Sequence, residues 1–182
     1  MKKVNRMKFY YWEPDPERSK SYGHVAIELE NGTYISFWPD VKHFRATREG
    51  NRITGIKSMC FPSFKDEVQK LLTDEEKKER EKYQWKLLYP DKIIPIMSMN
   101  EMAIEEWFVN FKSTDPKWTL LTQSCSNVIH EALCKGSTLF DQTQVVEGFI
   151  TTPKAVYQTV KKGFLQGKKA SIKLGSKCKA KP

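Results

Sequence analysis

Cys125 lies in a short polar stretch, Gln123-Ser124-Cys125-Ser126-Asn127, directly ahead of a helical pattern. Apolar residues follow Cys125 at the spacing of one helix face: Val128, Ile129, Ala132 and Leu133. The pattern therefore predicts a helix with Cys125 in its first turn and Gly136 as its stop. The partial positive charge of a helix N-terminus favours the thiolate, and its free backbone N–H groups can hold an oxyanion. This context makes Cys125 a candidate nucleophile, with a buried structural thiol as the alternative.

His24 lies in the first of two predicted strands, residues 22–30 and 33–38, which Pro39 ends. A two-residue turn at Asn31-Gly32 and a three-residue loop at residues 30–32 are both conceivable between them. The three-residue loop, with Gly32 left-handed, gathers the apolar residues on one face: Val25, Ile27, Leu29, Ile35 and Phe37. The opposite face then carries His24, Ala26, Glu28, Tyr34, Ser36 and Trp38. In this preferred register Ser36 lies diagonal to His24.

A strand histidine that faces a cysteine at a helix N-terminus is the thiol–imidazole pair of cysteine hydrolases. Residues 22–40 resemble the histidine hairpin of circularly permuted NlpC/P60-type, papain-like proteins, and residues 123–127 resemble their nucleophile segment. The histidine precedes the cysteine, an order shared by the lecithin:retinol acyltransferase-like group and by bacterial and poxviral relatives. The resemblance implies Cys125 as the nucleophile and His24 as the general base, with no cofactor and no metal.

In acyltransferases of that group a second histidine lies twelve positions after the first, where this chain has Ser36. A serine hydroxyl can orient an imidazole by hydrogen bonding, but it carries no negative charge. Ser36 is therefore a candidate orienting residue. Trp38, Gln123 and Ser124 are candidates for substrate binding, since Trp38 beside His24 could line an acyl or aromatic pocket; core packing is the alternative for this tryptophan.

The other thiols and imidazoles are expected to have lesser roles. His43 is a reserve base if the hairpin is misread, and His130 cannot face Cys125 from its position on the same helix. Inert thiols are expected at Cys60, Cys134 and Cys178. No CxxC pair is present, which disfavours a zinc site.

The remaining pattern predicts an α+β fold, with an antiparallel sheet packed against helices. Further strands are expected over residues 7–12 and 53–61. Helices are expected over residues 73–89, over residues 98–111 and from residue 152 onward. The second of these begins with a capping box at Ser98 and has Met102 on its apolar side. The expected domain covers residues 1–160, with a helical insertion over residues 63–112, and residues 161–182 form a basic tail.

The charge is concentrated in that tail. The chain carries 31 basic and 22 acidic residues, a formal net charge of +9, and residues 161–182 contain lysines but no acid. The tail is expected to be a solvated, flexible end, with weak contact to an anionic membrane or to nucleic acid as the alternative. No secretory signal or membrane-spanning segment is recognisable, which favours the cytoplasm and leaves export as an effector or toxin open.

The expected function is a cysteine-dependent hydrolase, a peptidase, amidase or thioesterase, that passes through an acyl-enzyme. Its substrate would be a peptide, an amide or an acyl ester. Three alternatives remain open: an acyltransferase of the same fold, an inactive papain-like binding module, and a nucleic-acid or membrane binder that acts through the lysine-rich tail. The sequence does not indicate an oligomeric state.

Overall fold

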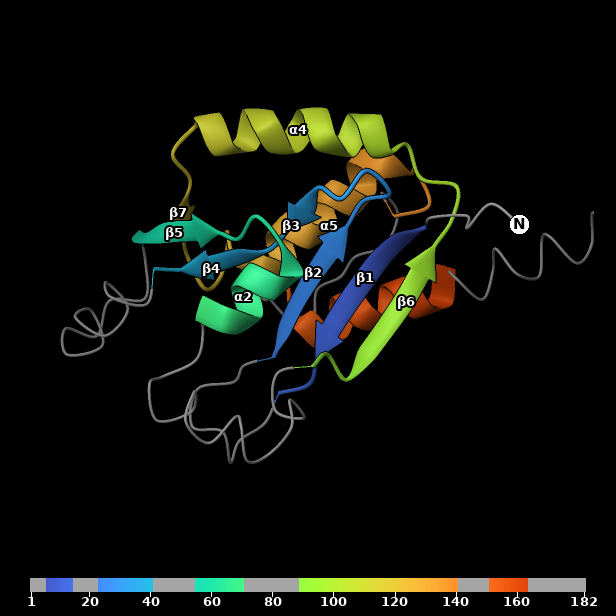
Figure 1. The fold of residues 1–182 in the computed structure, drawn as a ribbon, viewed down its shortest axis with the longest axis horizontal. Coiled ribbons are helices and arrows are strands. Elements are labelled where there is room, and N and C mark those ends of the chain that lie inside the picture. The colour runs from blue at the N-terminus through green and yellow to red at the C-terminus, as the bar shows by residue number, and fades with distance from the viewer. Residues whose placement is uncertain (1–5, 15–22, 41–54, 71–88, 141–150, 164–182) are drawn as a thin grey trace, which may run out of the picture.

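Two antiparallel sheets form the framework of the protein in the computed structural model, which describes residues 6–14, 23–40, 55–70, 89–140 and 151–163. The larger sheet has the strand order β3-β2-β1-β6 (Figure 1). Its strands are β1 (Met7–Trp12), β2 (His24–Glu28), β3 (Tyr34–Ile35) and β6 (Lys92–Ile96). The smaller sheet contains β4 (Phe37–Pro39), β5 (Ile56–Cys60) and β7 (Lys117–Trp118) in the order β4-β5-β7. The α+β class is confirmed.

The hairpin between β2 and β3 has the three-residue loop that the sequence favours. Ile27 pairs with Ile35, and the Leu29 amide donates to the Thr33 carbonyl at 2.9 Å. Gly32 has a φ of +90°, which a side chain would strain. The predicted faces follow from this register, so His24 and Ser36 lie on the same side of the sheet.

The predicted strand over residues 33–38 is interrupted at Ser36. Tyr34–Ile35 pairs with β2, whereas Phe37–Pro39 pairs with β5 in the smaller sheet. Ser36 is completely buried at the point where the chain passes from one sheet to the other. Side chains continue to alternate between the two faces on both sides of Ser36. The predicted faces of this strand are therefore retained although its pairing partner changes.

Helices cover the apolar face of the larger sheet. Helix α5 (Cys125–Gly136) packs against β2, helix α4 (Glu101–Ser113) packs against α5, and a helix over residues 153–163 stacks Tyr157 on Tyr11 (Figure 1). The core between helices and strands is built from fully buried side chains, among them Phe9, Val25, Ile27, Ile35, Ile104, Ile129, Leu133 and Val156. This packing determines where the N-terminus of α5 lies relative to β2.

Helix α2 (Phe64–Lys70) covers the opposite face (Figure 1). Phe64 stacks on Tyr10 with 5.2 Å between the ring centroids, and Tyr10, Ala26, Tyr34 and Phe61 form a second buried cluster there. The carboxylate of Glu67, from the same helix, is only 2% exposed. The mixed face of the hairpin is therefore an interior surface beneath α2.

Residues 63–112, which were expected as a helical insertion, also contribute β6 to the larger sheet, because residues 92–96 pair with β1 along its free edge. Helix α4 forms as expected, but its N-cap is Asn100, two residues after the expected cap Ser98. The side chain of Asn100 accepts from the Ala103 amide at 3.2 Å, whereas Ser98 has a φ of 62°. Met102, predicted on the apolar side, is 82% exposed.

Most of the helix expected over residues 73–89 lies outside the described residues, as does most of the basic tail. In the part of the chain that is described, no helix has both the length and the apolar character needed to cross a membrane.

Candidate functional site

Helix α5 places Cys125 at its first turn, as the sequence predicts. Ser124 caps the helix: its amide and its hydroxyl both donate to Asn127 Oδ1, at 3.0 and 2.7 Å. The preceding loop is closed by paired backbone hydrogen bonds between Thr119 and Gln123. Cys125 itself is partly exposed. The thiol therefore belongs to a partly exposed residue at a capped helix terminus.

Strand β2 places His24 against this thiol. His24 is the first residue of β2 and is 3% exposed, and its side chain forms a hydrogen bond with Cys125. The backbone amide of Val25 also donates to the Cys125 sulfur. The nucleophile and base proposed from the sequence are thus in contact, although they come from distant parts of the chain.

The other side of the imidazole faces a carboxylate that sequence reasoning missed. His24 Nε2 lies 2.9 Å from Ser36 Oγ and 3.2 Å from Glu67 Oε1. Because Nε2 already has these two partners, we assign the Cys125 hydrogen bond to Nδ1. The imidazole of His24 therefore contacts both the Cys125 thiol and the Glu67 carboxylate, and Ser36 lies beside the contact with Glu67.

Four donors hold Glu67 in place. Tyr34 Oη donates to Glu67 Oε2 at 2.6 Å and Trp38 Nε1 donates to Glu67 Oε1 at 2.9 Å, and His24 and Ser36 are the other two partners. Burial would raise the pKa of Glu67, but the charge and hydrogen bond of His24 and the hydrogen bonds of Tyr34 and Ser36 outweigh burial and lower it. Glu67 is therefore a buried carboxylate that stays ionised.

The electrostatics favour an ion pair between His24 and Cys125. Burial acts to lower the pKa of His24, but the charges of Cys125 and then of Glu67 outweigh it and raise that pKa to about 9. Burial likewise acts to raise the pKa of Cys125, and the charge and hydrogen bond of His24 bring it below its ordinary value. Near neutral pH this arrangement favours a thiolate and an imidazolium, the reactive form of such a pair.

His24 contacts two tryptophans, Trp38 of β4 and Trp12 of β1. Its ring centroid is 4.1 Å from that of Trp38, with an interplanar angle of 28°, and 5.3 Å from that of Trp12. Trp12 is directly opposite His24 in the β1–β2 register. An indole face attracts a cation, so the contact with Trp38 favours the charged imidazolium and restricts its rotation.

Four of the residues predicted for the site meet in the structure: Cys125, His24, Ser36 and Trp38. The substrate-binding roles of Trp38, Gln123 and Ser124 stay predictions, and the hydrogen bonds of Ser124 also make it the cap of α5. His43 and Cys178 lie outside the described residues.

The remaining predicted side chains lie apart from this arrangement. On α5, Cys134 Sγ is 3.7 Å from His130 Nε2, so this histidine pairs with a different thiol. Burial raises the pKa of the Cys60 thiol, which favours its protonated and unreactive form.

One sequence signal could have drawn attention to Glu67. Ser63 caps α2 by accepting from the Asp66 amide at 3.1 Å, and the spacing Ser63-x-x-Asp66 is a capping pattern. That pattern predicts the helix start at Phe64. It does not predict that the next carboxylate, Glu67, points into the sheet rather than into solvent.

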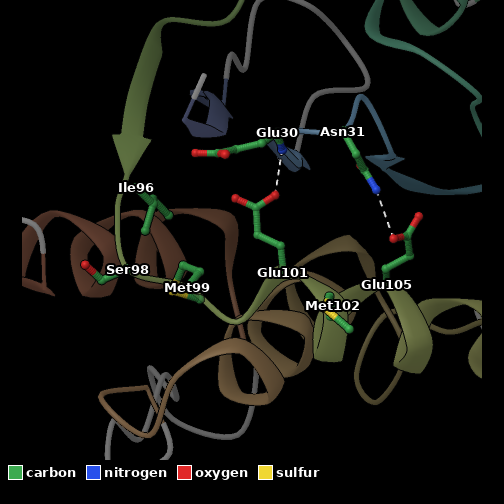
Figure 2. Close-up of a pocket in the computed structure, with 8 residues that line it drawn as sticks. All are labelled: Glu30, Asn31, Ile96, Ser98, Met99, Glu101, Met102 and Glu105. Atoms are coloured by element: carbon green, nitrogen blue, oxygen red, sulfur yellow. Dashed lines mark hydrogen bonds between the residues drawn. The ribbon is translucent and has the colours of Figure 1, made fainter. Parts of the chain in front are cut away.

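A hollow lies at the other end of β2, around the hairpin loop. Figure 2 shows Glu101 and Glu105 of α4 facing Glu30 and Asn31 of this loop. Glu101 Oε2 accepts from the Glu30 amide at 2.6 Å, and Glu105 Oε2 accepts from Asn31 Nδ2 at 2.9 Å. His24 begins β2, whereas this loop follows its end, so the hollow is separate from the thiol–imidazole pair. Among the described residues, no group of three or more histidine, cysteine or acidic side chains is arranged to hold a metal ion.

The chain has no match among protein-family models, curated proteins or solved structures. Functional inference therefore depends on the site itself.

Proposed function

We propose that the protein is a cysteine-dependent hydrolase, a peptidase, amidase or thioesterase that acts through an acyl-enzyme. The Cys125 thiolate attacks a carbonyl carbon, and the imidazolium of His24 donates a proton to the leaving group. Water then attacks the thioester, with His24 accepting its proton, and the thiolate is released. The observation that carries this proposal is the placement of His24 between Cys125 and the ionised carboxylate of Glu67.

Each part of the site has a role in this chemistry. Glu67 orients the imidazole and favours its charged form, as the third residue of a catalytic triad does. Backbone N–H groups at the first turn of α5 are the natural donors to the oxyanion of the tetrahedral intermediate. Cys125 is partly exposed as a residue, which agrees with the approach of a substrate to this end of α5.

A permuted papain-like fold of the NlpC/P60 type is the architecture we propose. In support, an antiparallel sheet carries the histidine on its second strand, and the cysteine begins a later helix that packs against that strand. The residue order, histidine before cysteine, agrees with the permuted arrangement.

An acyltransferase differs from this hydrolase only in the acceptor, an amine or alcohol in place of water, and the same residues support it. An inactive binding module is a weaker alternative. The main argument for an inactive module is that Ser36 offers no negative charge to His24. That argument is weakened because Glu67 provides the charge.

The test is the pH dependence of iodoacetamide alkylation at Cys125, followed by mass spectrometry of the intact chain and its peptides. An ordinary thiol has a pKa of about 8.5, whereas an imidazole-paired thiolate reacts well below pH 7. We expect rapid labelling of Cys125 near pH 6 and its loss in His24→Ala. Cys60, whose pKa is raised by burial, is the internal control and should label slowly. Labelling of Cys125 that follows an ordinary thiol and ignores His24 would contradict the proposal.

A further inference from the structure

An aromatic strip begins beside His24 and extends away from it along the mixed face of the larger sheet. Trp12 lies 5.3 Å from His24, Phe64 lies 6.2 Å from Trp12, and Tyr89 lies 6.1 Å from Phe64, measured between ring centroids. Trp12 and Phe64 are half-buried, and Tyr89 is 54% exposed. The strip therefore joins the buried imidazole to the outer surface through rings that retain accessible area.

The two tryptophans beside His24, Trp38 and Trp12, differ in their contacts. Trp38 is half-buried, like Trp12, but its indole N–H donates to the buried carboxylate of Glu67. Trp12 ends β1 directly opposite His24, the first residue of β2, and its ring lies 5.3 Å from the imidazole. A group held at His24 therefore lies beside the Trp12 ring.

Proton transfer from His24 to the leaving group determines which part of a substrate would lie beside Trp12. A general acid must come within hydrogen-bond distance of the leaving atom, so the group bonded to that atom lies next to the residues that surround the acid. We propose that Trp12 and Phe64 form the leaving-group subsite and select substrates whose leaving amine, alcohol or thiol carries an apolar, preferably aromatic, group. This inference rests on the proposed function and deepens it by naming a substrate class.

Microscopic reversibility makes the subsite measurable without the natural substrate. An amine that attacks the acyl-enzyme occupies the position that the leaving group had. Its nitrogen attacks the acyl carbon, the C–S bond to Cys125 breaks, and His24 takes the proton that the amine loses. The products are an amide and the free thiolate, which return the protein to its starting state.

The experiment loads Cys125 with an acetyl group from S-acetyl-N-acetylcysteamine and offers equal concentrations of benzylamine and ethanolamine. The ratio of the two acetamides is measured by mass spectrometry. We expect the wild-type protein to favour the benzyl amide about threefold to tenfold over the ratio that a free thioester gives in solution, the range of an aromatic stacking contact. Trp12→Leu should return the ratio to the solution value, and Trp12→Phe should retain part of the preference.

Leu121→Ala is the matched control. Leu121 is 52% exposed on the loop ahead of Cys125, so the change removes apolar surface near the nucleophile but not from the strip. It should leave the amide ratio at the wild-type value. The rate of acetyl loading, read separately as a mass increase, shows whether a Trp12 variant has also disturbed His24.

The outcomes separate the two proposals. If acetyl loading at Cys125 is normal and the amide ratio is the same in wild type and Trp12→Leu, the leaving-group subsite is wrong while the hydrolase proposal stands. If the wild-type chain accepts no acetyl group at Cys125, the proposed function is contradicted, and the subsite with it.

Discussion

Glu67 Oε1 lies 3.2 Å from His24 Nε2, on the ring nitrogen that we assign to the side away from Cys125. The contact joins a seven-residue helix to the first residue of a central strand. It brings a negative charge to His24. The orienting residue predicted from the sequence, Ser36, has no charge. We therefore expect this buried carboxylate to affect the pKa of the Cys125 thiol through His24.

Glu67→Gln should raise the pKa of Cys125 and lower that of His24. The carboxylate helps to hold the His24 pKa at about 9, and removing its charge should lower that pKa by about one unit or more. A less basic imidazole stabilises the thiolate less, so the acid limb of Cys125 alkylation should move to higher pH. The His24 titration can be followed by NMR, with a His24→Ala sample for assignment.

Asp66→Asn is the matched control for that change. Asp66 precedes Glu67 on the same helix and is exposed, so it loses the same charge without touching His24. Equal shifts in the two variants would mean that the effect is non-specific. Ser36→Ala should give a smaller change, about fivefold in alkylation rate, because it removes hydrogen bonds to His24 and Glu67 but no charge.

Substitutions of Trp38 separate its two contacts. Trp38→Phe keeps a ring against His24 but removes the donor to Glu67, whereas Trp38→Leu removes both. We expect the pKa of His24 to fall more in Trp38→Leu than in Trp38→Phe, because an aliphatic side chain offers no cation–π attraction. Equal values from NMR titration would show that the ring contact adds nothing beyond packing.

Acid should destabilise the wild-type fold through Glu67. The folded-state pKa of this carboxyl is lowered from a model-compound value of 4.5, so its contribution is fully present above that value. It is lost as the pH falls through the folded-state pKa. Urea unfolding at a series of pH values should show a steeper loss of stability below pH 4.5 in the wild type than in Glu67→Gln. Parallel curves would mean that Glu67 is not ionised in the folded protein.

Gly136→Ala should lower stability without altering the thiol. A Cβ at this position would lie 2.5 Å from Ile104 Cδ1 and 2.7 Å from Met99 Cε, so these side chains would have to move or α4 would have to shift away from α5. We expect a loss of about 1–3 kcal/mol in the free energy of unfolding. Gly136 is at the opposite end of α5 from Cys125, and the alkylation profile of the folded variant should match the wild type. A changed profile would indicate that the whole helix moves.

Local patterns predicted the elements whose residues carry their own signal. The strand over residues 7–12 and the helix that begins at Cys125 form as expected, because alternation in one and a polar cap followed by an apolar stripe in the other are local features. The hairpin register was also predictable, since only one loop length gathers the apolar side chains on a single face.

The features that escaped prediction depend on tertiary contacts. Strand β6 contains Pro95 and few alternating residues, and it forms because β1 offers a free edge. Helix α2 is too short for a periodic pattern to be distinctive. Glu67 is one of several charged side chains in its segment, and its burial follows from how α2 packs over Tyr34 and Trp38. Sequence reasoning therefore located the thiol and the base but not the carboxylate behind them.

The order of these groups along the chain has a consequence for biosynthesis. His24, Ser36 and Glu67 all precede Cys125, so the ribosome completes the acid–base half of the site before the sulfur is made. Because the imidazole is what lowers the pKa of the thiol, a nascent chain that has not yet docked α5 on β2 exposes only an ordinary cysteine. Under the proposed function, the reactive thiolate therefore forms only when folding brings α5 onto β2.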